Sequence, residues 1–296
     1  MTDVRHQFGG DWTIEKLALI EDYLRAYLVV LKNQPFVKGY IDAFAGTGYR
    51  EARDFTNSDL PLFPDLAAAE PQAMLDGSAR MALRLSPPFD RYVFIESRQD
   101  RCRALESLKT EFADLADKIQ IRQGDANDQI QNLCAMNWRQ RRAVMFLDPY
   151  GMQVEWATIK AIADTRAVDL WLLFPLGVGV NRLLARSGEI PMSWRHRLDV
   201  LLGTDDWFDA FYRFEAKRST LFDDEPQEQL VKASTATIGR YFNERLRSVF
   251  AAVADQPRVL RNSKGSPLYL LCFAAGNPEG APIAVRIANA LLDRAG

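Results

Sequence analysis

Hydrophobic and polar positions follow two alternating periods through the first 177 residues of the chain. Stretches with apolar side chains on one helical face alternate with short, nearly continuous apolar runs; the former include residues 13–31, 99–116 and 155–164, the latter 91–97, 143–151 and 168–177. The first spacing is typical of amphipathic helices, and continuous runs are typical of strands buried on both faces. Their alternation predicts a parallel sheet with helices on both sides.

The pattern changes after residue 177. Residues 178–256 show helical spacing and no convincing strand, with the longest helix expected over 226–254. Residues 257–276 form two strand-like runs around a glycine-containing turn, which predicts a hairpin. We therefore predict an α/β fold: a doubly wound, Rossmann-like sheet of five parallel strands, with a C-terminal antiparallel hairpin at its edge and a helical insertion.

This organisation implies one sheet core interrupted by two additions. Residues 1–177 and 257–296 are expected to form the core. Residues 51–76 have no clear period and contain three prolines, so we expect a loop or lid there. Residues 178–256 would recognise a substrate or a partner.

Composition narrows the class of protein. The chain has 296 residues and a formal net charge of −2, which argues against a surface devoted to nucleic acid but leaves a local basic groove open. The arginines of "RQRR" (139–142) are interpreted as solvated surface, with a phosphate contact as the alternative.

Cysteine usage and hydropathy add further expectations. The three cysteines are far apart in sequence and only two histidines are present, so we expect no metal site. The sequence shows no signal-peptide pattern and no membrane-spanning stretch, which predicts a cytoplasmic protein without membrane contact.

Acidic residues follow four consecutive predicted strands. The strands deliver Asp42 with the Gly46-Thr47-Gly48 turn, then Glu96, then Asp125-Ala126-Asn127, then Asp148-Pro149-Tyr150. Ligands of open parallel sheets bind outside the carboxyl ends of the strands. An aspartate after a strand is often only a helix N-cap, but four in series favour a ligand with hydroxyl groups and positive charge.

The glycine turn discriminates between cofactors. A nicotinamide dinucleotide favours GxGxxG, and Glu51 occupies the third glycine position here, so an oxidoreductase is disfavoured. No GKS or GKT follows, which excludes a P-loop. S-adenosylmethionine carries a sulfonium and an α-ammonium group and no phosphate, so it suits the acidic set better.

The segments "YIDAFAGTGYR", "FIES", "GDAND", "FLDPYGMQVEW" and "YLLCFAAGNPEG" resemble class I S-adenosylmethionine-dependent methyltransferases, and more narrowly the three-Cys-motif partner family, TcmP. The resemblance implies S-adenosyl-L-methionine as the cofactor and covers nearly the whole chain. The cofactor-binding positions that it implies are Asp42, Phe44, Ala45, Gly46, Thr47, Gly48, Glu96, Asp125, Ala126, Asn127 and Asp148.

The resemblance also implies a reaction and a partner. Asp148 and Tyr150 occupy the fourth motif, where an acidic or amide side chain and an aromatic ring position the methyl acceptor. The motif reads Asp-Pro-Tyr-Gly here rather than Asp/Asn-Pro-Pro-Tyr, so a nucleobase amine is not assured. We expect methyl transfer to a nitrogen or oxygen nucleophile, with nucleic acid or a modified base among the candidate substrates. The alternative is a cofactor-binding, non-catalytic adaptor of a three-Cys-motif protein.

Overall fold

The computed structural model describes residues 11–46, 77–149, 151–216 and 228–294. The helices are α1 (Asp11–Val30), α2 (Ser78–Leu83), α3 (Gln99–Glu111), α4 (Ala126–Cys134), α5 (Trp156–Asp164), α6 (Asn181–Leu183), α7 (Met192–Leu202), α8 (Trp207–Phe211), α9 (Thr235–Arg247) and α10 (Ala281–Arg294), with short turns η2 (Ala113–Lys118) and η3 (Leu176–Val180). The strands are β1 (Val37–Asp42), β2 (Arg91–Glu96), β3 (Ile119–Gln123), β4 (Arg141–Leu147), β5 (Val168–Phe174), β6 (Tyr212–Ala216), β7 (Glu228–Lys232), β8 (Ala252–Val253), β9 (Arg258–Arg261) and β10 (Pro267–Ala275).

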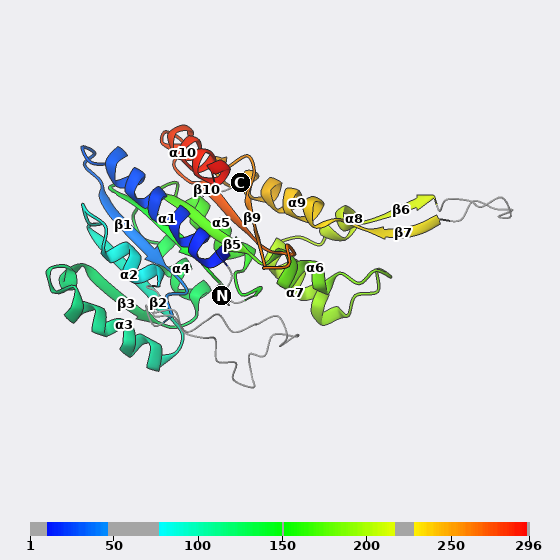
Figure 1. Cartoon of the computed structure of the whole chain (residues 1–296), viewed down its shortest axis with the longest axis horizontal. Helices are drawn as coiled ribbons and strands as arrows, with labels where there is room; N and C mark the ends of the chain where they lie inside the picture. Colours follow the sequence, from blue (N-terminus) through cyan, green and yellow to red (C-terminus); the bar gives the residue numbers. More distant parts are fainter. Residues whose placement is uncertain (1–10, 47–76, 150, 217–227, 295–296) are drawn as a thin grey trace, which may run out of the picture.

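The main sheet has the order β3-β2-β1-β4-β5-β10-β8, and β9 also pairs with β10 (Figure 1). Strands β1 to β5 are mutually parallel, whereas β10 runs antiparallel to β5, β8 and β9. The predicted fold class, a mostly parallel Rossmann-like sheet with a C-terminal antiparallel hairpin, is confirmed. The hairpin β9–β10 lies at this edge: β10 pairs with β5, and β9 and the short strand β8 lie on its outer side.

Helices cover both faces of this sheet, and the alternation of side chains along the strands explains why. In β4, Val144 and Phe146 join the cluster that packs under α1, α2, α3 and α10. Their neighbours Met145 and Leu147 join the cluster under α4, α5, α7, α8 and α9. Successive residues of a strand point to opposite faces, so strands that are apolar throughout require a helical layer on each side.

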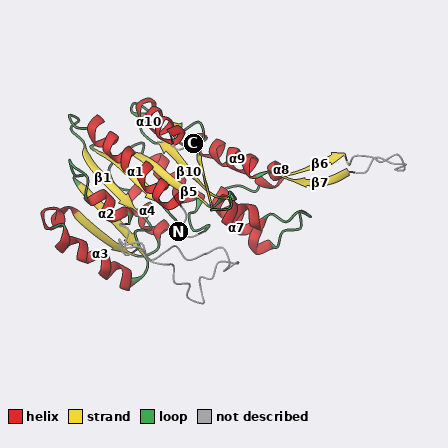
Figure 2. Cartoon of the chain, in the orientation of Figure 1, coloured by secondary structure: helices red, strands yellow, loops and turns green. Residues whose placement is uncertain are grey.

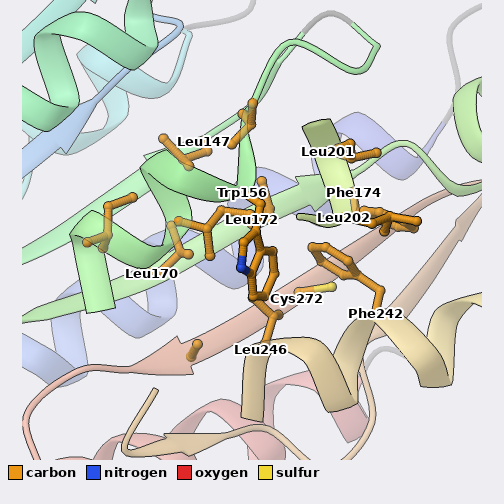
Figure 3. Packing of buried hydrophobic residues seen from close by; sticks show 14 of the residues in the cluster. Leu147, Trp156, Leu170, Leu172, Phe174, Leu201, Leu202, Phe242, Leu246 and Cys272 are labelled. Carbon is orange, nitrogen blue, oxygen red and sulfur yellow. The ribbon is translucent and has the colours of Figure 1, made fainter. Parts of the chain in front are cut away.

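The insertion packs on one of these faces and shares its core with the sheet (Figure 3). Phe242 of α9 stacks on Phe174 at the end of β5, with ring centroids 3.9 Å apart. The Trp156 ring of α5 contacts the Phe242 ring edge-on. The Arg245 guanidinium lies 4.4 Å from the Trp156 ring centroid.

The prediction that residues 178–256 lack strands is wrong. Strands β6 and β7 form a separate two-stranded antiparallel ribbon that extends away from the sheet (Figure 2). The helix expected over 226–254 extends only from Thr235 to Arg247. Ser234 ends the extended segment there, because its hydroxyl accepts a hydrogen bond from the Thr237 backbone N–H and caps α9.

Parallel pairing brings the carboxyl ends of β1 to β4 to one edge of the sheet. Asp42 stands opposite Phe94 of β2 and Phe146 of β4, and Glu96 stands opposite Gln123 of β3. The strand order reverses direction between β1 and β4, which is where open α/β sheets bind ligands. None of the described helices combines the length and the apolarity needed to cross a bilayer.

Candidate functional site at the carboxyl edge

Asp42 and Asp148 lie at the ends of the adjacent strands β1 and β4, and each interacts electrostatically with the other. Asp42 is fully buried and Asp148 is one-fifth exposed. The Asp42 carboxylate accepts hydrogen bonds from the Ser78 hydroxyl at 2.5 Å and from the Phe44 backbone N–H at 3.2 Å. Ser78 is the first residue of α2, so the helix that follows β1 along the chain contacts the carboxylate that ends β1.

Burial raises the pKa of Asp42 from 3.8 to about 7, since a charged carboxylate loses its hydration there. The two hydrogen bonds oppose this rise, while the negative charge of Asp148 adds to it and the positive charge of Lys16 opposes it. A carboxyl with so perturbed a pKa at a sheet switch point is a candidate functional group.

Lys16 belongs to the candidate site and was not predicted from the sequence. Its ammonium donates a hydrogen bond to Asp148 Oδ2 at 2.5 Å, and its side chain is only 3% exposed. The ammonium also lies 5.1 Å from the Trp12 ring centroid and 5.9 Å from that of Phe146. The available signal was a lysine on the apolar face of the first helix, between Trp12 and the buried Ile20.

One oxygen of Asp148 has no hydrogen-bond partner in the part of the chain that the structure describes. Its Oδ1 atom is inaccessible and makes no hydrogen bond among the described residues. Buried polar atoms in native proteins are nearly always paired. An unsatisfied carboxylate oxygen beside a satisfied one is a candidate acceptor for a ligand donor, which reaches it only when a neighbouring group moves aside.

Gly46 closes the short loop after β1 with a backbone φ of 60°, and no atom of the described residues lies within 4 Å of the position of a Cβ. Residues with a Cβ adopt this left-handed region at a cost. The Ala45 N–H donates to the Ile95 carbonyl at 3.1 Å, so this loop is fixed against β2. Phe44 is half-buried and packs against the core on the side of α4 and α5.

Glu96 ends β2 at the same edge of the sheet. Its Oε1 accepts hydrogen bonds from the Arg98 N–H at 2.9 Å and the Ser97 hydroxyl at 3.2 Å. Its Oε2 lies 3.9 Å from Arg101 Nη1. The side chain is thus oriented by its own turn, and Oε2 is the less occupied oxygen.

The third predicted position divides into two structural roles. Asp125 is exposed and is the N-cap of α4, where it accepts from the backbone N–H groups of Asn127 and Asp128. The Asn127 side chain is buried and joins α4 to the segment after β4: it donates to the Gln153 carbonyl and accepts from the Glu155 N–H and the Thr158 hydroxyl. Ala126 is buried between them. The Asn127 amide is therefore already committed to these partners.

Thr47, Gly48 and Tyr150 lie outside the described residues, as does the expected loop at 51–76. The structure thus brings Asp42, Gly46 and Asp148 together with Ser78 and Lys16. Glu96 and Asp125 lie along the same edge on the next two strands.

Two hollows lie at the other end of the sheet, and none of the predicted site residues lines them. One of about 70 Å³ is bounded by Tyr23, Asp169 and α10. The other, of about 420 Å³, lies among Arg139, Arg142 and Arg166. Arg142 stacks on the Phe36 ring at 3.9 Å and donates to the Arg141 carbonyl. We assign the site to the acidic edge because carboxylates, not arginines, complement a cationic ligand.

The part of the chain described by the structure holds no group of three or more histidine, cysteine or acidic side chains placed to share a metal ion. Cys102 and Cys272 are buried and Cys134 is half-buried, all as free thiols.

No family model matches the sequence, and no curated protein sequence matches it. Solved structures with a similar arrangement include a Legionella pneumophila protein of family DUF519, with 15% identity and a TM-score of 0.41 over 81% of this chain and 91% of that protein. An S-adenosylmethionine-dependent methyltransferase from Clostridium acetobutylicum has 12% identity and a TM-score of 0.37, over 88% of this chain and 92% of that one.

A spermidine synthase from Thermotoga maritima has 10% identity and a TM-score of 0.41. It aligns with 90% of this chain, which spans only 61% of the synthase. Similarity at this level concerns the general fold alone, so substrate and reaction depend on the residues of the site.

Proposed function

We propose that this protein is an S-adenosylmethionine-dependent methyltransferase that acts on a nitrogen or oxygen nucleophile. The proposal rests mainly on one observation: Asp42 and Asp148 converge beside the Gly46 turn, at the point where the strand order reverses. The likeness of "FAGTGYR" and "FLDPYGMQVEW" to the TcmP family supports the same assignment.

The residues present fit this cofactor. Gly46 offers backbone that no described side chain covers, suited to the methionine portion. The Asp42 carboxylate, at the same turn, provides negative charge for an α-ammonium group. Glu96 Oε2, on the neighbouring strand, can accept hydrogen bonds from ribose hydroxyls. Asp125 follows β3, where the adenine would lie.

When bound, S-adenosylmethionine supplies a methyl group on a sulfonium, and transfer from it depends chiefly on proximity and alignment. Asp148 would orient the acceptor, because its unpaired Oδ1 can accept a hydrogen bond from an N–H or O–H group. Lys16 holds the other oxygen and so fixes the direction of the carboxylate. Tyr150 remains a candidate for positioning the acceptor.

Calorimetric titration of the full chain with S-adenosylmethionine tests the cofactor assignment. We expect Gly46→Trp to abolish binding, because the indole would fill the space beside the turn. Gly265→Trp is the matched control, since Gly265 also has a positive φ of 76° and open space around a Cβ, in the turn between β9 and β10. Equal binding by wild type and Gly46→Trp refutes the assignment, and binding of NADH instead would favour an oxidoreductase.

The Lys16–Asp148 ion pair also suits a second candidate, a cofactor-binding but non-catalytic adaptor for a three-Cys-motif protein. A carboxylate neutralised within the protein can serve the fold without receiving a substrate. The two candidates differ in turnover. Binding of S-adenosylmethionine without release of S-adenosylhomocysteine, together with stable co-purification of a cysteine-rich partner, would establish the adaptor.

A further inference from the structure

Three positively charged side chains lie at the base of the β6–β7 ribbon, where the ribbon contacts the helices of the insertion. Lys232 ends β7 and donates hydrogen bonds to the Asn181 and Leu184 carbonyls, at 2.5 and 2.8 Å. Arg186 follows two residues after Leu184 and is exposed. Arg195 of α7 places its guanidinium 4.4 Å from the Phe208 ring centroid. We call Arg186, Arg195 and Lys232 the cationic cluster.

The cationic cluster lacks neutralising charge within the described residues. No carboxylate there forms an ion pair with any of its three members, although Glu189 and Asp209 are near them in sequence. Burial lowers the pKa of Lys232, and the positive charge of Arg186 lowers it further. Like charges held together without a counterion are unfavourable, and an anionic ligand would relieve this.

Aromatic side chains accompany this charge. Tyr212 of β6 packs against Phe208 in a tilted arrangement, with ring centroids 4.9 Å apart, so Arg195, Phe208 and Tyr212 form a continuous layer. Two residues further along β6, Phe214 is on the same face of the ribbon and is 72% exposed. A phenylalanine presented to water on the face of the ribbon that begins at Tyr212, beside Arg195 and Phe208, is suited to unpaired nucleotides, whose bases stack on aromatic rings.

The cationic cluster is linked to the candidate active site through η3. A Cβ on Gly179 would lie 3.1 Å from Cγ of Met152, so η3 packs closely on the loop that follows Asp148. The chain continues from η3 into α6, whose first residue, Asn181, accepts the Lys232 hydrogen bond. The ribbon is fixed at its base by a second contact, the Tyr212 hydroxyl donating to the Ala185 carbonyl at 2.6 Å.

We propose that this surface binds single-stranded nucleic acid, with phosphates at the cationic cluster and a base stacked on Phe214, and that it presents the methyl acceptor to Asp148. The last clause rests on the proposed methyltransferase function; the binding itself does not. An acidic peptide would use the same positive charge but has no base to stack on Phe214. A duplex would leave its bases stacked on one another and inaccessible to the ring.

Fluorescence anisotropy with the full chain and a labelled oligonucleotide of about 16 nucleotides, titrated between about 50 and 200 mM salt, tests this proposal. RNA and DNA probes are compared, each as a single strand and as a duplex. We expect Arg186→Gln and Arg195→Gln each to weaken binding and to reduce the salt slope by about 0.7, the value for one phosphate contact on a single strand. Phe214→Ala should weaken binding by about 5- to 160-fold and leave the salt slope unchanged.

Two matched control substitutions lie on helices outside the insertion. Arg103→Gln changes an exposed arginine on α3, and Ile283→Ala changes an exposed apolar residue on α10; both should bind as wild type does. The proposal is overturned if the wild type does not bind, if the cluster variants match the controls, if the duplex binds as tightly as the single strand, or if polyglutamate competes as well as unlabelled oligonucleotide.

Titration of the same variants with S-adenosylmethionine separates this proposal from the previous one. We expect Phe214→Ala and Arg186→Gln to retain cofactor affinity. If the wild type binds the oligonucleotide but not S-adenosylmethionine, the methyltransferase assignment is refuted and the proposed nucleic-acid surface is retained. If the wild type binds S-adenosylmethionine but not the oligonucleotide, only the proposed nucleic-acid surface is refuted.

Discussion

Asp42→Asn is the substitution that most directly tests the physical account of the acidic edge. Asparagine has nearly the same shape as aspartate and cannot ionise. Its carbonyl oxygen can accept from the Phe44 N–H, and its amide can donate to the Ser78 hydroxyl, which rotates to accept. The variant therefore removes the charge of Asp42 while retaining its hydrogen-bonding positions.

The magnitude follows from the pKa of Asp42. Burial raises that pKa from 3.8 to about 7, so the folded protein binds this proton more tightly than the unfolded chain does. The stabilisation by protonation is complete below pH 3.8 and is lost as pH rises through 7. At about 1.4 kcal/mol per pKa unit, the folded state is penalised by roughly 4 kcal/mol above pH 7. Since about 1.5 kcal/mol of this is already present at pH 5, between pH 5 and 8 the penalty grows by roughly 2.5 kcal/mol.

Denaturant unfolding of wild type and Asp42→Asn at pH 5 and pH 8 measures this difference. We expect the variant to gain stability relative to wild type as pH rises, by roughly 2 to 3 kcal/mol over this interval. Affinity for S-adenosylmethionine should fall in the variant at pH 8, because the ammonium group loses its counter-charge, and should fall less at pH 5, where a proton already neutralises Asp42 in the wild type. Other titrating groups are common to both proteins and cancel in the comparison.

Asp169→Asn provides the matched control. Burial also raises the pKa of Asp169, from 3.8 to about 6, but this residue begins β5 at the opposite edge of the sheet, where it accepts from the Tyr23 hydroxyl. Its substitution should give a smaller pH-dependent gain and leave cofactor affinity unchanged. If the stabilities of wild type and Asp42→Asn remain parallel from pH 5 to 8, the buried-charge account of Asp42 is wrong.

Three further substitutions test other parts of the site. Lys16→Met should destabilise the fold by about 3 to 5 kcal/mol, because it leaves the Asp148 charge without its partner, and adding Asp148→Asn should recover most of that loss in denaturant unfolding; a double variant as unstable as the single one would contradict this. Gly46→Ala should cost about 1 to 2 kcal/mol through backbone strain alone and weaken cofactor binding, whereas Gly265→Ala should show the same strain with unchanged binding. Asn127→Ala should cost roughly 2 to 4 kcal/mol, since it removes the acceptor of the Glu155 N–H and the buried Thr158 hydroxyl; a stable variant with impaired cofactor binding would instead indicate direct contact with the ligand.

The sheet could be predicted because each of its main strands appears in the sequence as a short apolar run. Continuous apolar runs such as 143–147 and 168–174 have side chains in both hydrophobic clusters, so helices on both faces follow from the composition of the strands alone. The β6–β7 ribbon could not be predicted in this way. "YRFEA" alternates apolar and polar residues over only five positions, and its partner strand "EQLVK" does not alternate, so the pattern is too short to predict a ribbon.

The site residues at the ends of strands could be predicted from the sequence. The site residues whose role depends on contacts between distant parts of the chain could not. Asp42, Glu96 and Asp148 follow from parallel strands that deliver their last residues to one edge. Lys16 is 132 positions from Asp148 in sequence, and its role follows only from how α1 packs on the sheet. The role of Asn127 was hidden similarly, because its three partners lie in the segment after β4.

The charges at the carboxyl edge do not balance within the described residues, and this links stability to ligand binding. Asp42 and Asp148 carry two negative charges when ionised, and Lys16 supplies one positive charge between them. The remaining negative charge is fully buried on Asp42, and a proton neutralises it below pH 7. A ligand ammonium would neutralise the same charge and compete with that proton, so the group that weakens the fold at high pH is the one prepared to bind a cation. An apolar residue at position 42 would avoid the penalty but would leave nothing to hold the ligand.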